Sequence, residues 1–140
     1  MNKRREIGDE DYAQLLEFRT GLRVFLKWSK AQAAKVGLAP SQHQLLLAIR
    51  GHQSGGEDPT IGEVADYLLI KPHSAAELVD RAVAEGLVER RPDNDDRRVV
   101  RLRLTRLGTS KLAAITSATL EELTRLSPRL RGIWRGLEEE

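Results

Sequence analysis

The sequence predicts a mainly α-helical protein of the α+β class, in which one two-stranded hairpin lies between helices. Apolar residues recur at spacings of three and four over most of the chain, the periodicity of helices that bury one face. Between Gly86 and Thr105 strand-like segments flank a Pro-Asp-Asn-Asp cluster, the composition of a hairpin loop. Long helical patterns at both ends enclose this more compact middle.

Composition limits the class of protein. The 140 residues suffice for one domain, and 40% hydrophobic with 31% charged residues indicates a folded globular chain. We expect a cytoplasmic protein outside the membrane, because no apolar run has the length of a membrane span and the first residues lack a signal-peptide core. The chain has no cysteine, which excludes disulfides, thiolate zinc ligands and thiol redox sensing.

The first helix is expected from about Asp9 to Val36. Spacings of three and four connect the apolar residues along it, namely Leu15, Phe18, Leu22 and Phe25. A helix of this length is hard to bury within one small monomer. The pattern therefore predicts a partner subunit.

Three shorter helices follow. The second is expected to begin near Pro40 or Ser41, with Ser41 as its cap, and to stop at Gly51. After a loop over 51–59, Thr60 and Glu63 form a capping-box signature for the third helix, since each side chain can bond to the other residue's amide. The fourth helix is expected to begin at Pro72, whose missing amide donor costs nothing there, and to end at Gly86.

The hairpin is rich in arginine. Seven arginines and four acidic residues lie among the 18 residues from Glu89 to Arg106. Alternation in the returning strand predicts an apolar face (Val100, Leu102 and Leu104) and a cationic face that we interpret as solvated (Arg101 and Arg103). The tip suits insertion into a nucleic-acid groove, and the alternative is a solvated hairpin whose charges protect an edge strand.

Arg90 and Arg91 have two open roles: contact with phosphates, or neutralisation of Asp93 and Asp95. After the hairpin, Thr105 is expected to cap a long fifth helix. Ser127-Pro128 is expected to interrupt that helix, so that a separate final helix follows.

This order of elements is that of a winged helix-turn-helix, with the third and fourth helices as the helix-turn-helix and the hairpin as the wing. Five blocks resemble the MarR family of bacterial transcription regulators, in order and with the family's spacing. The blocks are Thr60-Ile-Gly-Glu-Val-Ala65, Leu78-Val-Asp-Arg81, Gly86-Leu-Val-Glu-Arg90, Asp96-Arg-Arg98 and Leu104-Thr-Arg-Leu-Gly108. The resemblance covers residues 38–110 by motif and the terminal helices by pattern.

The resemblance implies a single domain over residues 1–140, with dimerisation helices at about 9–36 and 106–138 around a DNA-binding lobe at about 38–105. It implies a homodimer that binds a pseudo-palindromic operator in double-stranded DNA. The fourth helix would enter the major groove and the wing the flanking minor groove. It also implies a repressor that responds to a small-molecule effector, bound between the dimer layer and the lobe by residues that the sequence does not name.

The resemblance assigns the minor-groove contact to Arg98, with Asp96 as the residue that orients it. For Arg97, phosphate contact and simple solvation are equally open. On the fourth helix the candidate DNA-binding residues are Lys71, Pro72, His73, Ser74, Ala76, Glu77 and Arg81. We assign Lys71 to phosphate, whereas Arg81 either reaches DNA or pairs with Asp80 or Glu77.

The recognition helix departs from the family pattern at two positions. Ala76 stands where relatives often have Ser or Thr, and Glu77 where a small or basic residue is usual. Phosphates repel a carboxylate, although a cytosine amino group can donate to it. Glu77 therefore motivates an alternative, a winged-helix module that binds protein and not specific DNA.

We expect no enzyme, because no set of nucleophile, base and acid and no phosphate-binding glycine loop can be assembled from the sequence. His43 and His52 are nine residues apart and lack the organised spacing of a zinc site. No metal or other cofactor is expected.

Overall fold

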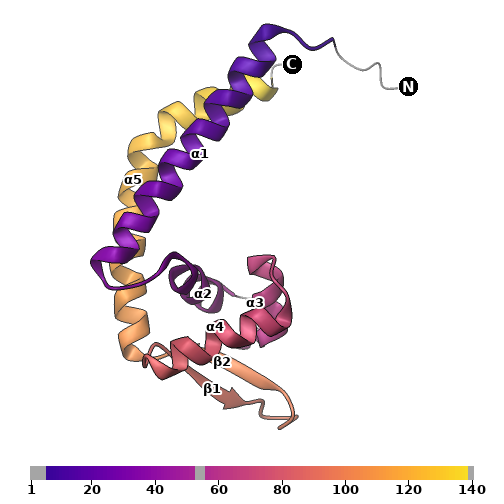
Figure 1. Ribbon diagram of the computed structural model, residues 1–140, viewed down its shortest axis with the longest axis vertical. Helices are drawn as coiled ribbons and strands as arrows, with labels where there is room; N and C mark the ends of the chain where they lie inside the picture. The colour runs from indigo at the N-terminus through magenta and orange to yellow at the C-terminus, as the bar shows by residue number, and fades with distance from the viewer. Residues whose placement is uncertain (1–5, 53–55, 139–140) are drawn as a thin grey trace.

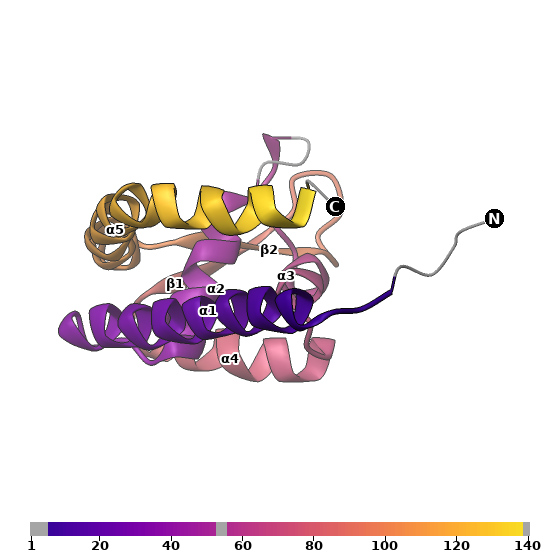
Figure 2. The ribbon, with the colours of Figure 1, turned by 90° about the horizontal axis from the view of Figure 1, so that it is seen from above.

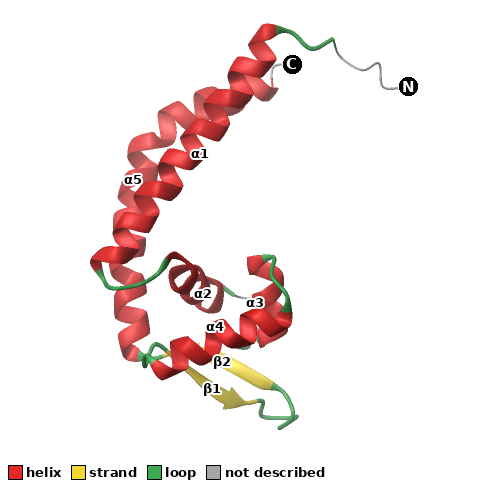
Figure 3. Ribbon diagram, viewed as in Figure 1, coloured by secondary structure: helices red, strands yellow, loops and turns green. Residues whose placement is uncertain are grey.

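The computed structural model describes residues 6–52 and 56–138, and within them helices and one two-stranded sheet follow each other in the expected order. The elements are α1 (Asp9–Lys35), α2 (Pro40–Gly51), α3 (Ile61–Leu68), α4 (Pro72–Ala84), β1 (Val88–Pro92), β2 (Val100–Leu104) and α5 (Arg106–Glu138). Figure 3 shows the helices in red and the single hairpin in yellow. The predicted winged helix-turn-helix of the α+β class is confirmed.

The elements form a lobe and an arm. The lobe contains α2, α3, α4 and the β1–β2 hairpin, while α1 and most of α5 project from it (Figure 1). α1 contacts both α5 and α2, so the arm is attached to the lobe through packed helices. Seen from above, both long helices lie in front of the lobe (Figure 2).

The hydrophobic core holds the lobe together. α2 lies at its centre and packs against α3, α4 and β2. The largest fully buried side chains in the core include Leu45, Leu46, Leu87, Leu102 and Ile115. α4 buries Ala75, Leu78, Val79 and Ala82, which leaves its opposite face exposed.

The cap of α3 is confirmed and the cap of α2 is corrected. The amide of Glu63 donates to the Thr60 hydroxyl at 3.2 Å, and the amide of Thr60 donates to Oε1 of Glu63 at 3.2 Å. α2 begins at Pro40 and not at Ser41, because Oε1 of Gln42 accepts from the amide of Ala39 at 3.1 Å. Ser41 is therefore not the cap.

α5 begins as expected but does not break at Pro128. The amide of Gly108 donates to the Thr105 hydroxyl at 3.1 Å, which confirms that cap. The predicted interruption at Ser127-Pro128 is wrong, because α5 continues to Glu138 with Pro128 inside it. Proline removes only one backbone hydrogen bond, and its φ suits a helix. The helix continues because packing of α1 against α5 stabilises it. Figure 1 shows α5 curving along its length.

The apolar seam of α1 stays largely exposed within one chain. Leu15 is 53% exposed, Leu22 is 47% exposed and Phe18 is 38% exposed. Phe25 is half-buried and stacks on Trp28 with ring centroids 6.1 Å apart. No described helix combines the length with the apolar content that crossing a membrane requires.

Candidate nucleic-acid interface

The exposed face of α4 carries most of the predicted contact residues. Pro72 occupies the first position of the helix, directly after Lys71. Lys71, His73, Ser74, Glu77 and Arg81 are exposed, whereas Ala76 is half-buried at the edge of this face. Free amides at a helix N-terminus favour negatively charged groups. The first turn of α4 is thus open to an anionic partner.

Charged neighbours of α4 pair differently from the sequence prediction. Nε2 of His73 lies 3.2 Å from Oε1 of Glu77, and both side chains are exposed. Asp80 pairs with Arg90 on β1, and Arg91 pairs with Glu89 at 2.9 Å. Among the described residues, Arg81 forms no ion pair with Asp80 or Glu77, which pair with Arg90 and His73.

The same contacts remove one of the two roles left open for the arginines of the first wing strand. Arg90 and Arg91 do not neutralise Asp93 and Asp95, because each pairs with an acid outside the hairpin loop. Arg90 instead attaches β1 to the recognition helix through Asp80. The base of the wing and α4 are thereby joined.

Asp96 holds Arg98 at the tip of the wing. Nε of Arg98 donates to Oδ1 of Asp96 at 3.0 Å and Nη2 donates to Oδ2 at 3.1 Å, while the Arg98 amide also donates to Oδ1 at 3.1 Å. These bonds lower the pKa of Asp96 and raise that of Arg98. The Arg98 side chain is nevertheless 91% exposed. The predicted pair is confirmed, and its guanidinium is oriented yet open to solvent.

Arg97 is exposed in the same turn. The β1–β2 loop lies at the same end of the lobe as the first turn of α4 (Figures 1 and 2). The arginines of the wing loop and the free amides at the start of α4 thus lie at one end of the lobe. Such an arrangement suits a long polyanion that spans both.

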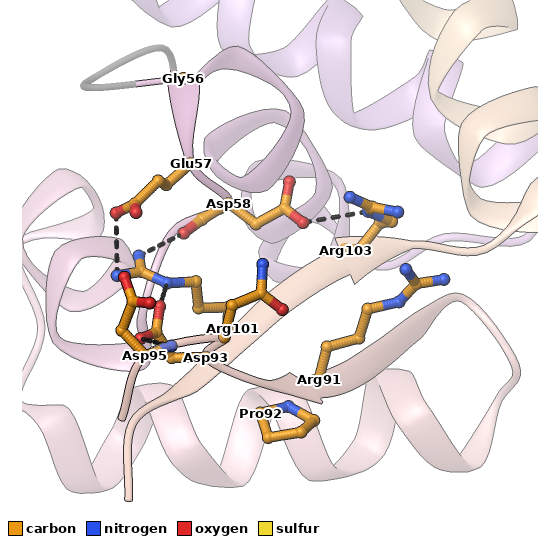
Figure 4. A pocket seen from close by; sticks show the side chains of 10 residues that line it. Gly56, Glu57, Asp58, Arg91, Pro92, Asp93, Asp95, Arg101 and Arg103 are labelled. Carbon is orange, nitrogen blue, oxygen red and sulfur yellow. Dashed lines mark hydrogen bonds and ion pairs between the residues drawn. The ribbon is translucent and has the colours of Figure 1, made fainter. Parts of the chain in front are cut away.

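The second wing strand does not have the predicted solvated cationic face. The Arg101 side chain is only 20% exposed and contacts Asp93, Asp58 and Glu57 (Figure 4). Nε of Arg103 donates to Oδ2 of Asp58 at 3.0 Å. The physical reason is that the segment before α3 covers this face, with Leu102 donating its amide to the carbonyl of Pro59 at 2.8 Å.

The sequence contained one signal for this contact that its interpretation missed. Glu57 and Asp58 form an acidic pair one residue before the capping box of α3, opposite in charge to the arginines of the returning strand. A cleft of about 260 Å³ lies between this pair and the wing. The described residues include no group of three or more His, Asp or Glu side chains placed to hold a metal ion.

Comparison with known proteins agrees with this geometry. The model of the MarR family matches residues 36–99, which include α2, the helix-turn-helix and the wing tip with Asp96 and Arg98. The chain is therefore similar to the MarR family over these residues. The chain is also 30% identical over 81 residues to the HTH-type transcriptional repressor MdtR of Bacillus subtilis. That match covers 58% of this chain but only half the length of MdtR.

Solved structures extend the MarR-family fold over nearly the whole chain. RV1404 from Mycobacterium tuberculosis is 21% identical with a TM-score of 0.74, and the match covers 99% of this chain and 95% of that one. A mutant MarR from E. coli, complexed with operator DNA, is 18% identical with a TM-score of 0.68. That match covers 96% of this chain and 98% of the E. coli chain. The long helices α1 and α5 are therefore part of the shared fold.

Proposed function

We propose that this protein is a DNA-binding transcription regulator. The observation that carries the proposal is Arg98, which is exposed at the wing tip and held there by two hydrogen bonds that its side chain donates to Asp96. A cation fixed in this way reaches a narrow minor groove, where the negative potential is deepest, without first being ordered. The E. coli MarR mutant, which shares the fold, is complexed with operator DNA, and this supports DNA binding as the function.

α4 would enter the major groove next to the wing. His73 and Ser74 lie exposed in its first turn, where they would meet base edges, while Lys71 would contact phosphate. Arg81, further along the exposed face, and Arg97, in the wing, would add phosphate contacts. His73 lies against Glu77, so the carboxylate that motivated a protein-binding alternative has a partner on its own helix.

We further propose a homodimer as the active form. The exposed apolar seam of α1 provides the surface, and a two-fold axis would place two copies of α4 in successive major grooves. Half-sites would then lie one helical turn apart, about 10 base pairs. The resemblance to MdtR, which is named a transcriptional repressor, supports a repressor role.

The resemblance to the family also supports a response to a small-molecule effector. A ligand that binds better to a dimer with wrongly spaced lobes would weaken operator binding, by about 1–3 kcal/mol for a typical coupling. The arm packs on the lobe through contacts of α1 and α5 with α2, so a ligand bound at this junction would act on the position of the lobe.

The test is a binding titration with the DNA upstream of the protein's own gene over a series of salt concentrations. Arg98→Ala should weaken binding about 5- to 150-fold, the range for loss of a specific groove contact. Arg125→Ala is the matched control, because Arg125 also pairs with an acid, Glu122 at 2.5 Å, but lies on α5 and outside the proposed DNA contacts.

Two results would contradict the proposal in different ways. Wild-type protein that shows no salt-sensitive binding to this DNA is not the proposed regulator. Wild-type binding that Arg98→Ala leaves intact would remove the wing from the interface. Glu77→Ala separates the alternative: unchanged or tighter DNA binding keeps the regulator, whereas loss of a protein partner favours the protein-binding module.

A further inference from the structure

Arg101 connects the wing to the segment that enters α3. Nη1 of Arg101 donates to the carbonyl oxygen of Asp58 at 2.8 Å, and Nη2 lies 2.9 Å from Oε2 of Glu57. Nη1 is also 4.0 Å from Oε1 of Glu63, the carboxylate that caps α3. One guanidinium thus faces three acceptor groups at the start of the helix-turn-helix.

The same side chain also reaches the wing tip. Nε of Arg101 donates to Oδ1 of Asp93 at 2.6 Å (Figure 4). Oδ2 of Asp93 in turn accepts from the amides of Asp95 at 3.1 Å and Asp96 at 2.9 Å. Because Asp96 holds Arg98, a continuous path of hydrogen bonds runs from the segment before α3 through Arg101, Asp93 and Asp96 to Arg98.

Removal of this cation would leave the carboxylates of Glu57 and Asp93 facing each other with Glu63 nearby. Like charges at such separations repel, and a two-stranded hairpin is only marginally stable by itself. The planar fork of arginine satisfies several acceptors in fixed directions, which a lysine ammonium does not do. Arg101 therefore both neutralises this cluster and fixes its geometry.

We propose that Arg101 is a positioning residue that sets where the Arg98 turn lies relative to the helix-turn-helix. It thereby matches the reach of the wing to the distance between the major groove occupied by α4 and the flanking minor groove. The inference rests on the proposed DNA-binding function, but the coupling between Arg101 and the wing tip is a property of the free protein. Arg101 itself stays covered by Glu57 and Asp58 and makes no DNA contact.

The first test is a double-mutant cycle on operator affinity. Arg101→Gln should weaken binding about tenfold in the wild-type background but less than about twofold when Arg98 is already Ala, because coupled residues are not additive. Arg103→Gln is the matched control: it lies on the same face and bonds to Asp58, but its effect should be equal in both backgrounds. An Arg101→Gln effect that is also equal in both backgrounds would overturn the inference.

The second test needs no DNA. The hydrogen bond from Arg101 is the largest influence that lowers the pKa of Asp93 below 3.8, so Arg101→Gln should raise that pKa towards 3.8 in an NMR titration. Exchange of the Asp96 amide should accelerate, while Arg103→Gln leaves both quantities unchanged. If Arg101→Gln does not fold, Asp93→Asn breaks the same path from the other side and should accelerate Asp96 exchange.

The two tests keep the proposals distinguishable. Wild-type protein that fails to bind DNA contradicts the regulator, whereas the titration and exchange still decide whether Arg101 holds the tip. An unchanged Asp93 pKa and unchanged Asp96 exchange in Arg101→Gln contradict the positioning role, whatever the protein binds.

Discussion

Leu69 adopts a backbone conformation that favours glycine. It ends α3 with φ 56° and ψ 41°, in the left-handed region, and its side chain is 91% exposed. The left-handed conformation costs a residue with a Cβ about 1–2 kcal/mol. Burial of the leucine side chain offsets almost none of this cost, so the position carries strain.

Leu69→Gly should therefore stabilise the protein by about 0.5–1 kcal/mol, after the entropy that glycine loses on folding. In urea denaturation of the purified variant, the midpoint urea concentration should rise while the dependence of the unfolding free energy on urea stays unchanged. Leu47→Gly is the control, because Leu47 is also exposed, at 50%, but lies inside α2. That change should cost about 1 kcal/mol. A midpoint for Leu69→Gly below that of the wild type would refute the argument from backbone strain.

Two arginines of the wing show which side-chain contacts the sequence alone can predict. Arg98 pairs with Asp96 two residues away, and the resemblance to the MarR family predicted this pair. Arg101 bonds to Asp58, which lies 43 residues earlier in the chain. Alternation along the strand showed which face Arg101 occupies, but the covering of that face depends on tertiary packing.

At the scale of elements, the start of α5 lies against the backbone of the segment between α4 and β1. The amide of Thr105 donates to the carbonyl of Leu87 at 3.0 Å, and the Thr105 hydroxyl donates to the carbonyl of Gly86 at 2.6 Å. A Cβ at Gly108 would lie 2.2 Å from the carbonyl oxygen of Leu87. Only glycine permits this approach of α5 to the lobe.

Gly108→Ala should destabilise the protein by about 1–3 kcal/mol or more, because backbone and not a flexible side chain must move. Gly62→Ala is the matched control: its Cβ would meet only the Thr60 hydroxyl oxygen at 3.9 Å, so helix propensity should make it neutral or stabilising. Thermal melts of both variants give the comparison. Equal melting temperatures for Gly108→Ala and the wild type would contradict the close approach.

The boundaries of elements were predictable where the signal is local. The capping box of α3 and the Thr105 cap of α5 each involve residues within three positions, and both were predicted from the sequence. Pro40 was one of the two expected starts of α2, but the cap was wrongly assigned to Ser41, because the Gln42 side chain accepts from the amide of Ala39. Pro128 was overinterpreted, because a single lost hydrogen bond does not end a helix that packs against another helix.

At the scale of the whole molecule, the position of α1 in the arm leaves its periodic apolar residues without a covering surface in one chain. Its periodic leucines and aromatic residues are core-like in sequence but stay partly exposed in one chain. Periodicity therefore predicted that α1 has a packing face, although neither the sequence nor a single chain identifies the surface that covers it. The proposed homodimer would cover this surface with a second copy of α1 and α5.

Leu15→Glu combined with Leu22→Glu should convert the homodimer into a monomer. Both leucines are about half exposed, at 53% and 47%, so the glutamates are tolerated in a free chain. In a dimer interface the same carboxylates would be desolvated without partners, at a cost of several kcal/mol. Sedimentation at micromolar concentration should then give the mass of one chain, and the melting temperature should lose its dependence on protein concentration.

DNA binding tests whether the dimer is also the functional unit. Two linked lobes bind successive half-sites with a high effective concentration, so the monomeric variant should lose about 10²–10⁴-fold in operator affinity with no change to α4 or the wing. Leu47→Glu is the control, because Leu47 is equally exposed but belongs to α2 in the lobe. It should stay dimeric and bind normally. Wild-type mass and affinity in the double variant would place the dimer surface elsewhere, because buried glutamates on both copies of α1 are incompatible with tight packing.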